Sequence, residues 1–72
     1  MKFKNIYSIE RDGLRIIKLS ENEFNLIDKD NKLILKQNYY YIYNLEDDEL
    51  RIIKISDNKY NLLNKSNNLI SK

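Results

Sequence analysis

Apolar and polar side chains alternate over short stretches of this chain, and each stretch is followed by a polar turn. The clearest stretch is 14–20, which is rich in β-branched residues and contains neither Gly nor Pro. In an extended conformation its apolar side chains fall on both faces, which is typical of a strand that lies centrally in a sheet or curves into a closed one. The pattern therefore predicts a β-strand over 14–20.

The residues that follow predict a return strand and a short third strand. Glu21 and Asn22 form a tight hairpin turn, because Asn tolerates the left-handed backbone that such turns need. Residues 24–28 form the return strand. A polar turn over 28–32 follows, with Asn31 at a left-handed position, and 33–35 form a third, short strand.

The segment before these strands is less regular. Residues 3–9 follow neither the helix nor the strand period, and we expect them to be extended or to form one turn of helix. Residues 11–13 are a turn signal that ends in Gly13, the single glycine of the chain. Its counterpart in the second half is Glu49, so we expect a type I turn that needs no positive φ in either place.

The whole pattern occurs twice. Residues 14–18 return as 50–54, and 18 of the 36 positions aligned by this shift are identical. The chain is therefore two copies of one unit, 1–36 and 37–72. We expect the strands of the second copy near 50–56, 59–64 and 68–71.

These elements predict an all-β protein. An isolated three-stranded unit of this size is marginally stable, and no Pro-, Gly- or Ser-rich linker separates the copies. We therefore expect a single domain over 1–72, in which two 36-residue three-stranded antiparallel meanders share one core. Open repeat arrays need about three units. Two units would instead close into a small barrel or sandwich with pseudo-two-fold symmetry, or form a homodimer, and either route hides exposed strand edges.

Residues 22–34 and their counterparts resemble the WG-type bacterial β repeat. That family has an aromatic-Gly pair, an apolar-Ile-Asp strand, a polar-Gly-Lys turn and a short apolar strand. The positions that carry the resemblance are Phe24 and Tyr60 for the aromatic residue, and Ile27-Asp28 and Leu63-Asn64 for the Ile-Asp pair. The chain departs from the family in having no Trp, and in having Asn25, Asn61, Asn31 and Asn67 where the family has glycines. The resemblance implies a β scaffold and carries over no catalytic residue.

Composition narrows the function classes. The chain has no Cys and no His, which removes thiol chemistry, the commonest metal ligand and the commonest general base. We therefore predict no enzyme activity, no catalytic residue, no metal site and no cofactor. No apolar run approaches the roughly 20 residues of a membrane span, and no signal peptide is evident. The abundance of Asn, Ile and Lys suggests an AT-rich bacterial or phage genome. We expect a small cytoplasmic protein, acting in the host cell where it is phage-encoded.

The densest aromatic stretch is the candidate partner-binding surface. It comprises Tyr39, Tyr40, Tyr41 and Tyr43, with Phe3 and Tyr7 as expected neighbours. Alternation places residues 39, 41 and 43 on one side of an extended segment and residues 40 and 42 on the other. One side is then core, and the other is either ordinary surface or a protein-binding surface, since Tyr gives a large contact area at low entropic cost. The favoured function is a non-catalytic module for protein–protein interaction, self-association included.

Two alternatives rest on charge. The acidic run Glu46, Asp47, Asp48 and Glu49 is interpreted as a solvated turn. The alternative is that it lets a small phage or mobile-element protein inhibit a nucleic-acid enzyme by occupying its basic cleft. The third hypothesis is a weak nucleic-acid-binding barrel, in which the tyrosines stack on bases beside a basic stripe of Lys2, Lys4, Arg15, Lys18, Arg51 and Lys54. The net charge of +2 does not favour nucleic acid.

Overall fold

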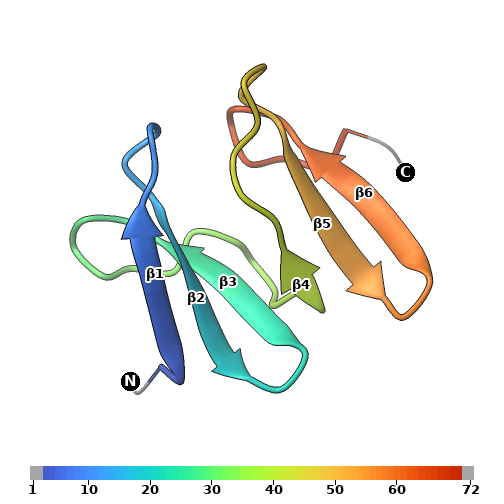
Figure 1. Cartoon of the computed structure of the whole chain (residues 1–72), viewed down its shortest axis with the longest axis horizontal. Helices are drawn as coiled ribbons and strands as arrows, with labels where there is room; N and C mark the ends of the chain where they lie inside the picture. Colours follow the sequence, from blue (N-terminus) through green and yellow to red (C-terminus); the bar gives the residue numbers. More distant parts are fainter. Residues whose placement is uncertain (1–2, 71–72) are drawn as a thin grey trace.

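The chain folds into two three-stranded antiparallel sheets, as the computed structural model describes for residues 3–70. Figure 1 shows the sheets side by side, and no helix is present in this part of the chain. The strands are β1 (Asn5–Ile9), β2 (Arg15–Ser20), β3 (Glu23–Ile27), β4 (Tyr41–Ile42), β5 (Arg51–Ser56) and β6 (Lys59–Leu63). The all-β prediction with two three-stranded antiparallel units is therefore confirmed.

The two sheets have the same internal register. In the first, Ile17 pairs with Ile6 of β1 and with Asn25 of β3. In the second, Ile53 pairs with Ile42 of β4 and with Asn61 of β6. Each of these pairs is related to its counterpart by the 36-residue shift seen in the sequence. Because a slip of one residue would reverse the faces of a strand, the shared register places equivalent side chains in equivalent positions.

The expected third strand was assigned to the wrong segment. Residues 5–9 are the third member of the first sheet, while 33–35 contribute a single bridge between Leu33 and Ile27. The loop 28–32 closes tightly, because Asp28 accepts hydrogen bonds from two amides within it. The Ile34 amide also donates to the Leu26 carbonyl at 2.8 Å, so this segment lies along the edge of β3 without forming a strand. The second copy does the same through Leu63 and Leu69, and the last part of the predicted strand 68–71 lies outside the described residues.

One hydrophobic cluster joins the two copies. Its buried members are Ile16, Phe24, Leu26, Leu35, Tyr39, Ile42, Ile53 and Leu63. The first four and the last four come from different copies. Strand β3 is buried on both faces after its first residue, whereas β6 is exposed at its first two residues and fully buried only at Leu63. The core therefore lies over β3 and β4, between the two sheets.

Of the closed arrangements that the sequence suggested, the barrel is wrong. The backbones of the two sheets are joined by a bridge, in which Phe24 and Tyr39 exchange hydrogen bonds of 2.7 and 2.9 Å. Beyond it, β1 pairs with β2 alone and β6 with β5 alone. Residues 28–40 connect β3 to β4, and the second copy lies beside the first. Figure 1 shows corresponding strands running in the same direction, with β1 and β4 both rising in this view. The copies therefore follow one another in the same sense and are not related by a two-fold axis.

The turn before β2 and its twin before β5 also differ from expectation. Gly13 has φ 83° and Glu49 has φ 67°, so both copies use the left-handed region and not a type I turn. The left-handed position predicted for Asn31 is confirmed, with φ 63°, and its twin Asn67 has the same value. Glu49 is therefore a side chain held in a conformation that favours Gly or Asn.

Candidate protein-binding groove

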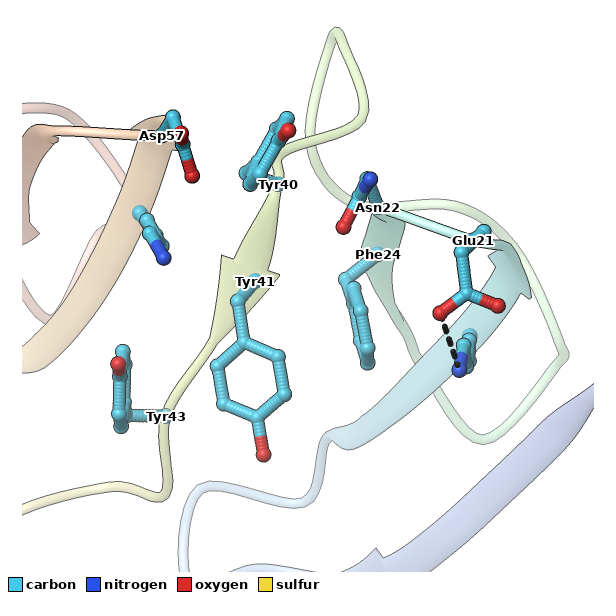
Figure 2. A pocket seen from close by; sticks show the side chains of 9 residues that line it. Glu21, Asn22, Phe24, Tyr40, Tyr41, Tyr43 and Asp57 are labelled. Atoms are coloured by element: carbon cyan, nitrogen blue, oxygen red, sulfur yellow. Dashed lines mark ion pairs between the residues drawn. The ribbon is translucent and has the colours of Figure 1, made fainter.

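Three aromatic rings form a ladder where the two copies meet. The rings of Phe24 on β3 and Tyr41 on β4 lie edge to face, with centroids 4.7 Å apart and planes at 64°. Tyr41 and Tyr43 repeat this geometry at 4.8 Å and 73°. Figure 2 shows the three side chains in a row between the two sheets. Edge-to-face pairs of this kind add to the stability gained from burial.

Backbone pairing sets the direction of these tyrosines. Tyr41 is paired with Lys54 on β5, and the amide of Tyr43 donates to the carbonyl of Ile52 at 3.0 Å. Ile42, between them, is 1% exposed and belongs to the core. Alternation along the extended chain then turns Tyr41 and Tyr43 outward, where they are 41% and 37% exposed.

The ladder lies in a groove of about 670 Å³. Its lining residues are Lys18, Glu21, Asn22, Phe24, Tyr40, Tyr41, Tyr43, Lys54 and Asp57. Four of these are two repeat-related pairs, Lys18 with Lys54 and Glu21 with Asp57. Each copy thus supplies one cation and one anion to the groove.

The lysines lie against the aromatic rings. Lys18 Nζ is 5.8 Å from the centroid of Phe24 and 3.6 Å from a carboxylate oxygen of Glu21. Lys54 Nζ is 5.7 Å from the centroid of Tyr40 and 5.8 Å from that of Tyr60. At such distances an ammonium group is attracted to the face of a ring. The groove therefore offers flat apolar surfaces beside groups of both charges, which suits a peptide segment of mixed composition.

The structure divides the tyrosines of the predicted partner-binding surface between the groove and the core. Tyr41 and Tyr43 are exposed in the groove, and Tyr40 is half-buried at its wall. Tyr39 is 8% exposed and belongs to the core. The strand begins only at Tyr41, so the alternation expected from residue 39 onward does not extend to residues 39 and 40.

Phe3 and Tyr7 are not part of this groove. Tyr7 lies on β1, the outer edge of the first sheet, and is 42% exposed. Phe3 is half-buried just before that strand. Sequence reasoning missed the contribution of Phe24 to this groove. It placed Lys18 and Lys54 beside the tyrosines only in the nucleic-acid hypothesis, although both lysines belong to the most strongly repeated stretch of the chain.

The acidic run forms an exposed turn. All four of its residues are exposed, and the Glu46 amide donates to the Leu50 carbonyl at 2.9 Å. Asp48 Oδ1 accepts the Leu50 amide at 3.1 Å, and Arg11 donates to the Glu46 carbonyl at 2.5 Å. Figure 1 shows this turn at the top of the view, at the opposite end of the second sheet from β4. The exposure and the hydrogen bonds of this run agree with its interpretation as a solvated turn.

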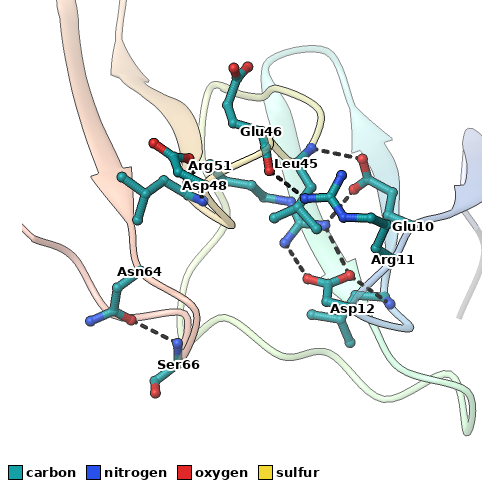
Figure 3. Close-up of polar contacts among 11 residues, drawn as sticks. Glu10, Arg11, Asp12, Leu45, Glu46, Asp48, Arg51, Asn64 and Ser66 are labelled. Atoms are coloured by element: carbon teal, nitrogen blue, oxygen red, sulfur yellow. Dashed lines mark hydrogen bonds and ion pairs between the residues drawn. The ribbon is translucent and has the colours of Figure 1, made fainter.

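The corresponding turn of the first copy holds a buried arginine (Figure 3). Arg51 is 2% exposed; its Nη1 donates to Asp12 Oδ2 at 2.8 Å and its Nη2 donates to Glu10. Glu10 also accepts the Leu45 amide at 2.8 Å. Partial burial raises the pKa of Asp12, but hydrogen bonds from Arg51 and from the Leu14 amide outweigh it, so this pKa is below its usual 3.8. Arg51 is thereby neutralised inside the protein and cannot serve in the basic stripe suggested by the sequence.

Residues 3–70 contain no group of three or more acidic side chains placed to hold a metal ion. They also form no helix long and apolar enough to cross a membrane. Comparison of the chain with protein-family models, with curated proteins and with solved structures finds no match. The resemblance to the WG-type repeat therefore stays a prediction that rests on the residues alone.

Proposed function

We propose that this chain is a non-catalytic protein-binding module, and that the aromatic groove takes up a segment of its partner. The observation that carries the proposal is the ladder Phe24–Tyr41–Tyr43, whose two tyrosine rings stay exposed in a groove with charges of both signs. Exposed tyrosines fixed by backbone pairing bind at low entropic cost, and they are common energetic centres of protein interfaces.

The charges set the expected chemistry of the bound segment. Lys18 and Lys54 attract its acidic side chains, while Glu21 and Asp57 attract its basic ones. The rings take apolar side chains and proline. We therefore expect a segment in which apolar residues are flanked by charges of both signs.

Nucleic acid is the second candidate, because Lys18 and Lys54 lie near the aromatic rings of Phe24 and Tyr40 in the groove that also exposes Tyr41 and Tyr43. Cations close to aromatic side chains are the combination that proteins use to bind single strands. Glu21 and Asp57 in the same groove oppose phosphate. A single-stranded oligonucleotide would bind with a steep dependence on salt, whereas a peptide of balanced charge would not. The hypothesis of an acidic inhibitor stays a prediction, and it would act through Glu46–Glu49 and not through the groove.

The test is selection of ligands from a random peptide display library with the whole chain as bait. Enriched peptides are then measured against a variant carrying Tyr41→Ser and Tyr43→Ser. The matched control is Tyr7→Ser, which removes an equally exposed tyrosine outside the groove. We expect the double variant to bind at least about tenfold more weakly and the control to bind as the wild type does. Equal binding by all three proteins would contradict the proposal, provided circular dichroism shows them folded.

A further inference from the structure

The contact between the two copies joins two different faces. The first copy contributes the outer side of β3 and the carboxylates of Glu10 and Asp12, which we call the tail face. The second copy contributes Tyr39, Ile42 and Arg51, which we call the head face. Because the copies follow one another in the same sense, each copy carries both faces. One tail face and one head face are therefore left over, at opposite ends of the molecule.

The leftover tail face is uncovered apolar surface. Tyr60, the counterpart of Phe24, is 56% exposed, whereas Phe24 is 5% exposed. Leu62 is half-buried, whereas its counterpart Leu26 is fully buried. With Ile70, which is 49% exposed, they border a hollow of about 500 Å³. The residues that a neighbouring copy buries in the first unit are thus open in the second.

The leftover head face shows the same difference. Ile6 is 52% exposed, whereas its counterpart Ile42 is 1% exposed. Arg15 is exposed, whereas Arg51 is 2% exposed. Phe3 stands at the position that Tyr39 uses to bridge the two sheets.

The charges of the two free faces are complementary. Arg15 on the head face forms no ion pair within residues 3–70, and neither does Glu46 or Asp48 on the tail face. These are the repeat counterparts of the arginine and the two carboxylates that pair inside the molecule. The two free faces therefore carry the side chains of the ion pairs that join the internal units. These side chains cannot meet within one molecule, because they lie at its opposite ends.

We infer that a second copy of this chain docks head to tail, its head face on the free tail face, and so repeats the contact between the two internal units. Phe3 of the incoming copy forms a backbone bridge with Tyr60, as Tyr39 does with Phe24. Its Ile6 covers the apolar hollow, and its Arg15 forms ion pairs with Glu46 and Asp48. A head-to-tail contact of this kind is heterologous, so each added copy offers a further free face until the copies close into a ring or extend into an open chain. It also covers the free edge of β6. The inference does not rest on the groove, which uses different residues.

The test is a charge exchange across the new contact. Arg15→Glu places a carboxylate against Glu46, and Glu46→Arg places a guanidinium against Arg15. Both sites are exposed, and the Glu46 side chain makes no hydrogen bond in the described part of the chain, so both variants should fold. Each is measured by sedimentation velocity up to millimolar concentration, alone and in an equimolar mixture.

We expect the wild type to grow in mass with concentration, and each variant alone to associate at least about tenfold more weakly. The mixture should regain assembly, because each variant's head face then meets an oppositely charged tail face. A variant with Tyr41→Ser and Tyr43→Ser should assemble as the wild type does, which separates this inference from the groove proposal. A wild type that stays monomeric, a variant that assembles unchanged, or a mixture that behaves like its components would each overturn the inference.

Discussion

Arg51 in the second repeat donates to Asp12 in the first across 2.8 Å, and this ion pair fastens the two repeats together over 39 positions of sequence. Arg15 occupies the same place in the first repeat and has no acidic partner in the described chain. Two identical residues in nearly identical strands are thus in opposite environments. The difference arises because the two copies point in the same direction. Arg51 therefore faces the first copy, whereas no further copy lies beside Arg15.

Arg51→Met should destabilise the protein by about 3 kcal/mol, because it leaves Glu10 and Asp12 without the cation that offsets their partial burial. The matched control Arg15→Met changes an exposed side chain and should stay within about 0.5 kcal/mol of the wild type. Urea unfolding at low protein concentration, where copies do not associate, measures both. Equal losses for the two variants would show that the pair does not fasten the repeats.

The repeat made much of the fold predictable. Identity at a fixed spacing of 36 residues requires equivalent strands, and the β-branched stretch at 14–18 marks the central one. The sequence could not show that 5–9 takes the other edge of that strand, because these residues follow neither the helix nor the strand period. Residues 33–35 lie instead against β3, where they form a single bridge.

The candidate site was predictable only in part. Tyr41 and Tyr43 stand out in the sequence as aromatic residues two positions apart. Phe24 and Lys18 join them only because the first copy lies beside β4. That placement depends on how the copies are arranged, and pseudo-two-fold symmetry, which we expected, would have brought together other residues. Nothing local in the chain distinguishes the two arrangements.

Glu49→Gly should stabilise the protein by about 1 kcal/mol, because Glu49 has φ 67° and a side chain is strained there. The reciprocal change, Gly13→Glu, should cost about as much, since Gly13 has φ 83°. A Cβ atom added at Gly13 would have no heavy atom within 4 Å, so the expected loss of stability comes from the backbone conformation and not from a steric clash. Thermal unfolding of both variants beside the wild type measures the two effects, which should have opposite signs. A destabilising Glu49→Gly would contradict this explanation.

Asn25→Ala should destabilise the protein by about 3 kcal/mol. Asn25 is 1% exposed, and its Oδ1 accepts the amides of Leu26 and Leu35 at 2.7 and 3.1 Å. Its Nδ2 donates to Asn38 Oδ1 at 2.9 Å. The substitution therefore leaves the Leu35 amide without its acceptor in the core. The control Asn38→Ala removes one of these bonds at an exposed residue and should cost about 1 kcal/mol. Chemical denaturation should rank the two in this order.

The first loop contains an acid-sensitive carboxylate that the second repeat replaces with an amide. Asp28 Oδ1 accepts the amides of Asp30 and Lys32 at 2.8 and 3.0 Å. Asn64 Oδ1 accepts those of Ser66 and Asn68 at 2.9 and 3.1 Å, the first of which is drawn in Figure 3. The hydrogen bond from the Lys32 amide is the largest cause that holds the pKa of Asp28 below its usual 3.8. A carboxylate whose pKa is lower in the folded state stabilises the protein above its unfolded pKa, and this stability is lost as the pH falls through the folded pKa.

Asp28→Asn should therefore fold normally, as the second repeat does with Asn64, and should lose less stability between pH 4 and pH 2 than the wild type. Part of the acid sensitivity should remain, because the pKa of Asp12 is lowered as well. The reciprocal variant Asn64→Asp places a carboxylate among the same two amides and should make the loss on acidification steeper. The measurement is the free energy of unfolding in urea at several pH values. Parallel pH profiles for the two variants would show that the loop amides do not act on the carboxylate, since only a difference in proton affinity between the folded and unfolded chain can change the slope.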